Sequence, residues 1–396
     1  MKTKSLTQVC NITTGKLDAN AGIPNGKYPF FTCAPDPLRI DTFAFDDDVV
    51  LLAGNNAQGN FHIQRFKGKF NAYQRTYVIT ARDGYDIDYV KYSLELSLQH
   101  LKRIAQGSQT KFLTMQILDS FRVVDIPYDA QRHLIGSIRE VDSKISLNTC
   151  ICAELETMAK TLYDYWFTQF DFPDENGKPY RSSGGEMVWN DQLKREIPKG
   201  WRAGNLGDLG TITSGGTPST GNDAYYTDKG IAWITPNDLS GNEHLMFFSH
   251  GERDVTQEGL KSSSAVLMPV GTVLFSSRAP IGYISIAENE VCSNQGFKSI
   301  VPNKGYGSYF VYYTVKTNTP AIAQQGVGTT FKEVSRDTME RFQIVLPPVD
   351  VATQFEDFLN ASLEKRRILE HENRELTKLR DWLLPMLMNG QAVVSD

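Results

Sequence analysis

The chain has 396 residues, enough for two or three domains, and 40 % of them are hydrophobic, which is enough to build proper cores. The net charge of −5 excludes nucleic-acid binding through overall positive charge, so any such function requires local patches. The five cysteines are scattered and form no C-x-x-C pair, which argues against a disulfide framework or zinc site and favours a cytoplasmic protein. No apolar run reaches the roughly 18 residues that span a bilayer, so we expect no membrane partner.

Residues 1–128 are predicted to form a first module. Their short strand-like runs, separated by Gly, Asn and Pro, are typical of a mixed, strand-rich α/β domain. Between residues 60 and 111, nine basic residues stand against four acidic ones. The stretch "FHIQRFKGKFNAYQR" also interleaves basic and aromatic residues, which favours DNA phosphates and base edges as ligands. A solvated hairpin with alternating charges is the alternative. The candidate DNA-binding residues are Gln64, Arg65, Lys67, Lys69, Asn71, Gln74 and Arg75.

Residues 129–170 are predicted to form one long helix, about 60 Å in length at 1.5 Å per residue. Its apolar positions alternate steps of four and three over four heptads, from Leu134 to Trp166, which predicts a coiled-coil seam. Asn148 falls within this seam. It either fixes the register of a buried helix pair or faces solvent. Residues 171–200, rich in Pro, Asp and Gly at their start, are predicted to be a linker.

Residues 201–347 are predicted to form a second module, which is less basic than the first. Four of its loops are rich in Ser, Thr, Asn and Gly, residue types that contact phosphates through hydroxyl and backbone N–H groups. These loops are "SGGTPSTGND", "ITPNDLSG", "SSRAPIG" and "GVGTTFK". The candidate DNA-binding residues are Thr217, Ser219, Asn237, Ser277, Arg278, Thr329 and Lys332.

Residues 348–396 are predicted to hold a second long helix and a C-terminal tail. Its apolar repeat is looser, with Arg366 and Asn373 interrupting the seam, and Pro385 is expected to kink or end the helix. The most economical partner for this helix is the first long helix. A two-fold axis across such a pair makes it antiparallel.

An internal repeat organises the whole chain. "NAYQRTYVI" aligns with "CSNQGFKSI", "VVLLAGNNAQGNF" with "TVLFSSRAPIGYI", and "GKYPFFT" with "KGIAWIT". The alignment pairs Gln74 with Gln295, which lie 221 residues apart (295 − 74). We therefore predict an α+β protein with two mixed α/β recognition domains, two long antiparallel helices as a coiled-coil spacer, and a pseudo-two-fold internal repeat.

This architecture favours DNA as the ligand. Duplex DNA has local two-fold axes, so two copies of a reading module can bind it equivalently, with their separation setting the spacing of the half-sites. Because the two modules differ in sequence, we expect the half-sites to differ as well.

The sequence resembles the specificity subunits of type I restriction–modification systems. The resemblance covers nearly the whole chain and depends on "LYDYWFTQFDFPDENGKPYRSSGGEM" with "IPKGW", on "SGGTPS" with "WITPNDL", and on "LPP" followed by "LTKLRDWLLPMLMNG". Nothing like "IPKGW" precedes the first module, which leaves the N-terminal edge of that module open.

The resemblance implies a non-catalytic subunit whose target recognition domains read the two halves of a split, asymmetric DNA site. It implies two methyltransferase subunits bound by the helices, and restriction subunits in the full complex. S-adenosylmethionine, ATP and Mg²⁺ would be held by those partners, and this chain would bind no cofactor. The residues expected to contact another subunit are Tyr163, Tyr165, Trp166, Phe167, Trp382 and Leu383.

The sequence contains no recognisable catalytic or metal-binding motif. The [N/D]-P-P-[Y/F] loop of an adenine methyltransferase is absent, no G-x-G-x-x-G follows a strand, and the acidic triplet at 46–48 is expected to be a solvated turn. Three alternatives stay open: a methyltransferase or nuclease with unrecognised motifs, a structural coiled-coil protein that binds protein or sugar, and a DNA- or protein-binding adaptor outside restriction–modification.

Overall fold

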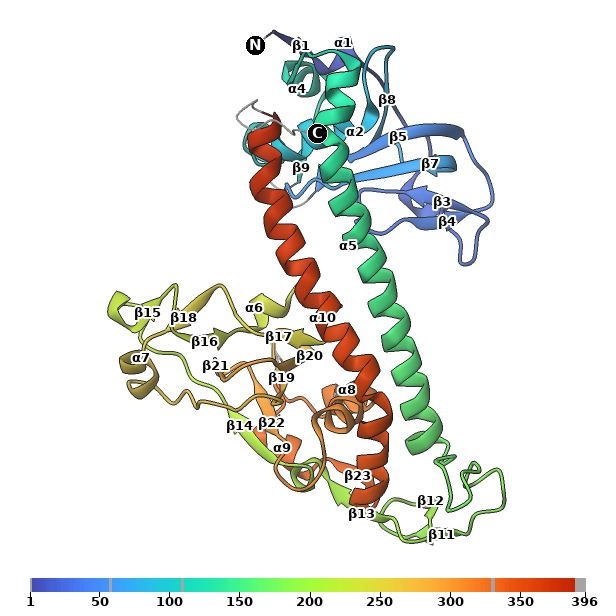
Figure 1. The fold of residues 1–396 in the computed structure, drawn as a ribbon, viewed down its shortest axis with the longest axis vertical. Coiled ribbons are helices and arrows are strands. Elements are labelled where there is room, and N and C mark those ends of the chain that lie inside the picture. Colours follow the sequence, from blue (N-terminus) through green and yellow to red (C-terminus); the bar gives the residue numbers. More distant parts are fainter. Residues whose placement is uncertain (1, 57–58, 108–109, 329–331, 389–396) are drawn as a thin grey trace. The chain divides into compact units, whose positions relative to one another are not determined.

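The computed structural model divides the chain into two compact units (Figure 1). Unit 1 comprises Met1–Ser146 and Arg374–Asp396, and unit 2 comprises Leu147–Asn373. Helices α5 (Tyr128–Tyr163) and α10 (Val349–Met388) each contribute a part to both units. The residues that the structure describes are 2–56, 59–107, 110–328 and 332–388. No helix within these ranges is long and apolar enough to cross a membrane.

Unit 1 is built around a six-stranded sheet in the order β2-β8-β5-β7-β3-β4. Strands β3 and β7 are parallel, whereas β5 pairs antiparallel with both β7 and β8. The strands are β1 (Thr3–Ser5), β2 (Cys10–Thr14), β3 (Tyr28–Phe31), β4 (Leu38–Ile40), β5 (Phe45–Ala53), β6 (Asn55–Asn56), β7 (Ile63–Ala72), β8 (Thr76–Ala81), β9 (Lys111–Phe112) and β10 (Arg122–Val124). The shorter helices are α1 (Leu6–Val9), α2 (Ile87–Leu96), α3 (Leu98–Ile104) and α4 (Met115–Ser120), with a 3₁₀ turn at Ala19–Ala21.

The strands of this sheet alternate between two apolar cores. Val50 and Leu52 of β5 pack with Leu94 of α2 in one cluster, whereas Val49 and Leu51 pack in a second cluster on the other side. This follows from the period of two in a strand, which sends successive side chains to opposite faces. The predicted turn at 46–48 is wrong, because these residues belong to strand β5.

Unit 2 contains a five-stranded sheet, β14-β22-β19-β20-β17, and a four-stranded sheet, β15-β18-β16-β21. Its strands are β11 (Met187–Asn190), β12 (Arg195–Pro198), β13 (Arg202–Asn205), β14 (Thr211–Ser214), β15 (Tyr226–Thr227), β16 (Ile231–Ile234), β17 (Phe247–Phe248), β18 (Arg253–Val255), β19 (Val273–Ser277), β20 (Ile281–Ala287), β21 (Val291–Ser293), β22 (Lys298–Val301) and β23 (Gln343–Leu346). Its helices are α6 (Pro236–Leu239), α7 (Gln257–Lys261), α8 (Ser308–Gln324) and α9 (Arg336–Arg341), and short 3₁₀ turns lie at Leu206–Asp208 and Asp223–Tyr225.

The segments that begin the two predicted modules, at β1 and β13, have the same local structure. In unit 1, β1 pairs with β10, and the backbone N–H of Leu6 donates to Phe121 O at 3.1 Å. In unit 2, β13 pairs with β23, and the N–H of Leu206 donates to Phe342 O at 3.0 Å. The residue before each leucine is the N-cap of a short helical turn with a capping box, Ser5 in the first case. This pairing describes the edge of unit 1 that the sequence left open.

Helices α5 and α10 run antiparallel within each unit. In unit 2, Asn148 is fully buried, and its Nδ2 donates to Asn373 Oδ1 at 3.0 Å and to Glu372 Oε2 at 2.8 Å. The solvent-facing alternative for Asn148 is therefore wrong. In unit 1, Arg380 donates to Asp142 Oδ1 at 3.2 Å. Helix α10 also passes through Pro385 and continues to Met388, so this proline does not end it.

Candidate nucleic-acid interface

In unit 1 a tight turn joins β7 to β8 and exposes Gln74 and Arg75. The N–H of Thr76 donates to Tyr73 O at 2.8 Å, which closes the turn. The Gln74 amide donates from Nε2 to Asp18 Oδ1 at 2.6 Å, and its backbone N–H donates to Leu17 O at 2.9 Å. The glutamine is thus held at the surface by Asp18, 56 positions earlier in the chain, and by its neighbour Leu17.

A hollow opens beside this turn. Polar groups of Gln74, Arg75 and Thr14 share its lining with aromatic and aliphatic side chains. The lining residues are Thr14, Gly54, Gln74, Arg75, Tyr77, Phe112 and Leu113. The backbone of Gly54 lies so close to the turn that a Cβ on this residue would be 2.3 Å from Arg75 O. The hollow therefore combines fixed polar groups with apolar walls, as a binding site requires.

In unit 2 the corresponding turn lies between β21 and β22 and exposes Gln295. The N–H of Phe297 donates to Asn294 O at 3.3 Å, and the Thr217 hydroxyl donates to Gln295 Oε1. Lys298 Nζ contacts both Gln295 O, at 3.3 Å, and Glu333 Oε1, at 3.2 Å. Three of the four loops predicted from the sequence contact this turn, through Thr217 and through the backbone groups of Ile234 and Ser277. Glu333, which follows the fourth loop, contacts Lys298.

Matching hydrogen bonds hold the two turns. Gly54 N–H donates to Arg75 O at 2.8 Å, and Ser277 N–H donates to Gly296 O at 2.7 Å. A second pair joins each turn to the parallel strand beside it: Tyr73 to Phe31 O at 2.9 Å, and Asn294 to Ile234 O at 3.0 Å. A third joins Leu113 to Gly54 O at 2.8 Å, and Val334 to Ser277 O at 3.0 Å. The sequence repeat aligns the residues of the first two pairs with one another. In the third pair, Leu113 and Val334 keep the same offset along the chain.

Glycines provide a further correspondence at the turns. A Cβ on Gly15 would lie 1.8 Å from Ala72 O, and one on Gly215 would lie 2.1 Å from Ser293 O. In both units the end of the first strand of the sheet therefore lies directly against the strand that enters the turn. Only a residue without a side chain permits that approach.

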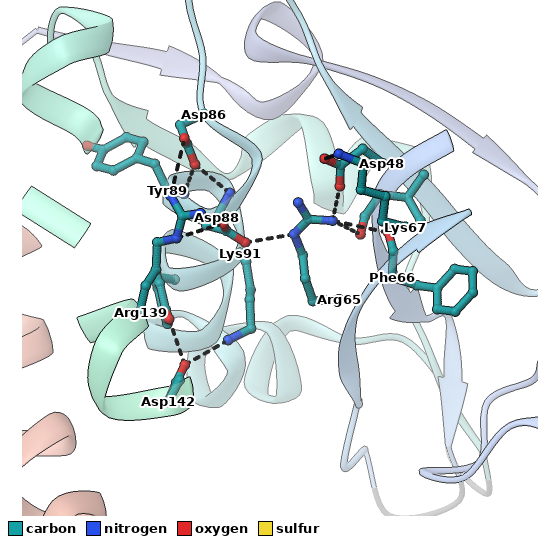
Figure 2. A network of polar contacts seen from close by, with 12 residues as sticks. Asp48, Arg65, Phe66, Lys67, Asp86, Asp88, Tyr89, Lys91, Arg139 and Asp142 are labelled. Atoms are coloured by element: carbon teal, nitrogen blue, oxygen red, sulfur yellow. Dashed lines mark hydrogen bonds and ion pairs between the residues drawn. The ribbon is translucent and has the colours of Figure 1, made fainter. Parts of the chain in front are cut away.

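Arg65 lies in an internal network of ion pairs (Figure 2). Its guanidinium contacts Asp48 of β5 and donates from Nε to Asp88 of α2 at 2.7 Å. Arg139 of α5 reaches the same Asp88 at 3.3 Å. Burial alone would raise the pKa of Asp48, but its hydrogen bond with Arg65 and the charges of Arg65 and Lys67 lower it overall. Arg65 therefore connects the sheet to its covering helices, and most of its hydrogen-bonding capacity is used inside unit 1.

The other predicted DNA-binding residues of unit 1 differ in how exposed their side chains are. The Lys67 side chain is 79 % exposed, and Lys69 lies 4.7 Å from the centre of the Phe43 ring. Gln64 donates from Nε2 to Pro35 O at 2.8 Å. Asn71 is buried at 5 % exposure, and its Oδ1 accepts from the N–H of Ala72, so the prediction that it reads a base edge is corrected.

Unit 2 shows a similar division. Ser277 is fully buried and donates to Gly296 O at 3.1 Å, so it supports the turn and the prediction of a direct DNA contact is corrected. Arg278 is partly exposed, with its guanidinium 3.6 Å from Glu333 Oε2. Thr329 lies outside the described residues. The remaining candidates are exposed: Thr217, Ser219, Asn237 and Lys332.

The aromatic end of α5 belongs mostly to the core of unit 2. Tyr163, Trp166 and Phe167 are at most 8 % exposed, and the Tyr163 hydroxyl donates to Thr314 Oγ1 at 3.1 Å. The prediction that these three residues contact another subunit is corrected, because rings of α8 and α10 already cover them. The helix itself continues as a π-helical turn, Asp164–Thr168, which leaves Tyr165 37 % exposed.

The two remaining interface candidates lie on α10 in unit 1. Trp382 is 58 % exposed, whereas Leu383 is partly buried against the core of unit 1. Of the six predicted interface residues, Trp382 and, to a lesser extent, Tyr165 are therefore the exposed ones.

Sequence reasoning missed two features of the site. Gln295 was aligned with Gln74 but not proposed as a ligand-binding residue, although that pairing was the available signal. The segments "LTQVCNITTG" and "LGDLGTITSG", at 6–15 and 206–215, were also not compared, although they share the leucine and the ITxG end. Among the described residues, no cluster of three or more His, Cys, Asp or Glu side chains could hold a metal ion.

Comparison with known families decides the assignment. A family model described as the type I restriction modification DNA specificity domain matches residues 1–157 and 198–378. The chain belongs to this family. Each matched segment contains one of the two exposed turns, so the family's two domains, of mixed helix and strand, carry one candidate interface each.

Named relatives agree with this assignment. The chain is 35 % identical over 223 residues to the specificity subunit of the type I restriction enzyme MjaIX from Methanocaldococcus jannaschii, a match that covers 52 % of this chain and 51 % of that protein. It thus spans about half the length of that relative. The HindI specificity subunit from Haemophilus influenzae is 24 % identical over 344 residues, 74 % of each chain. The fold resembles the crystal structure of a type I restriction–modification S subunit from M. genitalium, with a TM-score of 0.60, 13 % identity, and coverage of 98 % and 95 %.

Proposed function

We propose that this chain is the non-catalytic DNA-recognition subunit of a type I restriction–modification complex, and that it reads a bipartite, asymmetric site in double-stranded DNA. The observation that carries the proposal is the pair of equivalent turns. Both units hold an exposed glutamine on a turn whose next residue accepts a backbone hydrogen bond from the neighbouring strand, at 2.8 and 2.7 Å, but they surround the glutamine with different side chains. The same backbone structure with different side chains around it would allow the two units to bind two half-sites of different sequence.

The helices would act as an antiparallel coiled-coil spacer in a molecule with an internal two-fold repeat. The contact between Asn148 and Asn373, 3.0 Å from Nδ2 to Oδ1, supports this role because a buried polar pair in an apolar seam specifies the register of the helices. The same strand pairings at the start of both predicted modules support the repeat.

The helices would also bind two methyltransferase subunits, and restriction subunits would join the full complex. Large apolar side chains on the outer surfaces of the helices support this part of the proposal. In unit 2 these include Phe358 and Ile368, at 63 and 56 % exposure, and in unit 1 Trp382, at 58 %. S-adenosylmethionine, ATP and Mg²⁺ would be bound by the partner subunits, and this chain would contribute no catalytic group.

The test is a DNA-binding measurement on the purified full chain together with its methyltransferase partner. Sequence-dependent binding that weakens steeply with salt is expected, since neutralising several phosphates releases their counterions. Binding that is insensitive to both sequence and salt would contradict the proposal. As a control, the chain alone should not bind S-adenosylmethionine, and binding would favour a complete methyltransferase instead.

A further inference from the structure

Each turn has one arginine beside its glutamine, but the arginine comes from a different element in each unit. In unit 1, Arg75 follows Gln74 on the turn itself. In unit 2 the equivalent position is Gly296, and Arg278 follows Ser277 at the end of β19. Because Gly54 and Ser277 make the same bond to the turn, the residue equivalent to Arg278 in unit 1 is Asn55. The two arginines thus lie at two neighbouring positions of the same backbone arrangement, one on the turn and one at the strand end bonded to it.

Packing explains why unit 2 has no arginine on the turn. A Cβ on Gly296 would lie 2.9 Å from Cγ of Pro236, and also 2.9 Å from Oδ1 of Asn294. A side chain at that position would have to displace the proline of α6. The strand end one step away has room, and there the guanidinium of Arg278 lies 3.6 Å from a carboxylate oxygen of Glu333.

The partial exposure of both arginines fits a ligand that is added from outside. Arg75 is exposed at the edge of the hollow lined by Gln74 and Thr14. The Arg278 side chain is 36 % exposed. Its partner Glu333 also forms an ion pair with Lys298 at 3.2 Å. The Glu333 carboxylate therefore positions Arg278 but leaves some of the N–H donors of the guanidinium available.

We propose that Arg75 and Arg278 are the specificity-determining arginines of the two half-sites, each reading one guanine in the major groove beside the shared glutamine. This inference rests on the proposed function. An arginine fork donates two parallel hydrogen bonds to O6 and N7 of guanine, a pattern that no other base presents there. A lysine retains the charge but not the planar fork, so it can replace a phosphate contact but makes the guanine contact with poorer geometry.

The experiment selects bound duplexes from a randomised pool, using the full chain assembled with its methyltransferase partner. The wild-type assembly should select one split motif. Arg75→Lys should reduce the preference for one guanine, in one half of the motif, by about 5- to 150-fold. Arg278→Lys should do the same in the other half. Each variant should leave the opposite half, and the slope of binding against salt, unchanged.

Alanine variants and one control complete the design. Arg75→Ala and Arg278→Ala should relax the same single positions, with thermal unfolding monitored to exclude misfolding. Lys67→Ala removes a side chain that is 79 % exposed and should weaken binding to all sequences equally.

Two outcomes would overturn the inference. One is an unchanged motif for the lysine variants together with a uniform loss of affinity for the alanine variants, which would identify the arginines as phosphate contacts. The other is a change in both halves of the motif from a single substitution. A wild-type assembly that selects no motif would instead overturn the proposed function, and the inference with it.

Discussion

Helix α5 carries one acidic anchor in each unit, Asp142 in unit 1 and Glu156 in unit 2. Each accepts hydrogen bonds from a tyrosine and a lysine of the helix that covers the sheet. For Asp142 these are Tyr92 at 2.6 Å and Lys91 at 3.3 Å. The equivalent donors to Glu156 are Tyr313 at 3.0 Å and Lys316 at 2.5 Å. Each anchor also pairs with an arginine of α10.

The two anchors differ in how deeply that arginine is buried. The side chain of Arg380 in unit 1 is 30 % exposed, whereas that of Arg366 in unit 2 is 4 % exposed. Arg366 also bonds Glu370 at 2.7 Å and His244 O at 2.8 Å, and Glu370 accepts from the backbone N–H of Phe247. Similar residue types therefore form a partly exposed contact in one unit and a network around a buried arginine in the other. The unfolding of unit 2 should depend on its network far more strongly.

The largest effect is expected from Arg366→Met. Removing the cation leaves the buried carboxylate of Glu370 without its counter-ion and the partly buried Glu156 with Lys316 alone, which should cost about 3–5 kcal/mol in the free energy of unfolding. Urea denaturation measures this loss. Arg367→Met is the matched control, because that side chain is 45 % exposed and its ion pair with Glu364 is screened by solvent. Equal losses for the two variants would contradict the comparison.

A smaller loss is expected from Arg380→Met, the equivalent change in unit 1. With its partner Asp142 also accepting from Tyr92 and Lys91, the loss should be about 1 kcal/mol. The same denaturation experiment applies. Lys378→Met, at a side chain that is 73 % exposed, should be close to neutral. A loss as large as that of Arg366→Met would show that burial does not distinguish the two anchors.

Another difference between the two units predicts a pH effect that is confined to unit 2. Glu356 of α10 accepts from Phe310 N–H at 2.6 Å near the start of α8, whereas in unit 1 the neutral Gln131 accepts from Asp86 N–H at 2.9 Å before α2. Burial raises the pKa of Glu356 to about 7, despite the opposing effect of these backbone hydrogen bonds. A raised pKa in the folded state gives a contribution to stability that is complete below the ordinary value of 4.5 and is lost as pH rises towards 7.

Thermal unfolding at pH 6 and pH 8 should therefore show a lower midpoint for unit 2 at the higher pH, by about 2–4 °C for each 1 kcal/mol lost. Glu356→Gln should reduce this pH dependence, because the amide stays neutral and its oxygen still accepts a hydrogen bond. An unchanged pH dependence in the variant would exclude Glu356 as its source.

The smallest effect on stability is expected from Lys67→Ala. Its ammonium lies 3.7 Å from Asp48 and is largely in solvent, so the change should stay within about 0.5 kcal/mol. Arg65→Ala, two residues earlier, removes the internal pairs with Asp48 and Asp88 and should cost more stability than Lys67→Ala. The two variants thus separate a surface charge from a structural one within a single strand.

Much of the architecture was predictable from the sequence because its signals are local or repeat at a fixed offset. The helices at 128–163 and 349–388 follow from apolar positions that repeat every three or four residues. Aligning Gln74 with Gln295 also brought together the backbone groups that make matching hydrogen bonds in both units. That register was available without coordinates, because it depends only on the order and spacing of residues along the chain.

What the tertiary structure decided is which side chains remain available to a ligand. Tyr163 and Phe167 lie off the predicted seam, yet Phe310, some 150 residues later in the chain, covers both of them. Asn71 and Ser277 have side chains that could bind a ligand, but both lie in strands and are buried. The periodicity of a helix or strand states which residues share a face. Only the packing of distant segments determines whether that face is covered, and this explains why the sequence could propose segments for an interface but could not tell which of their residues are exposed.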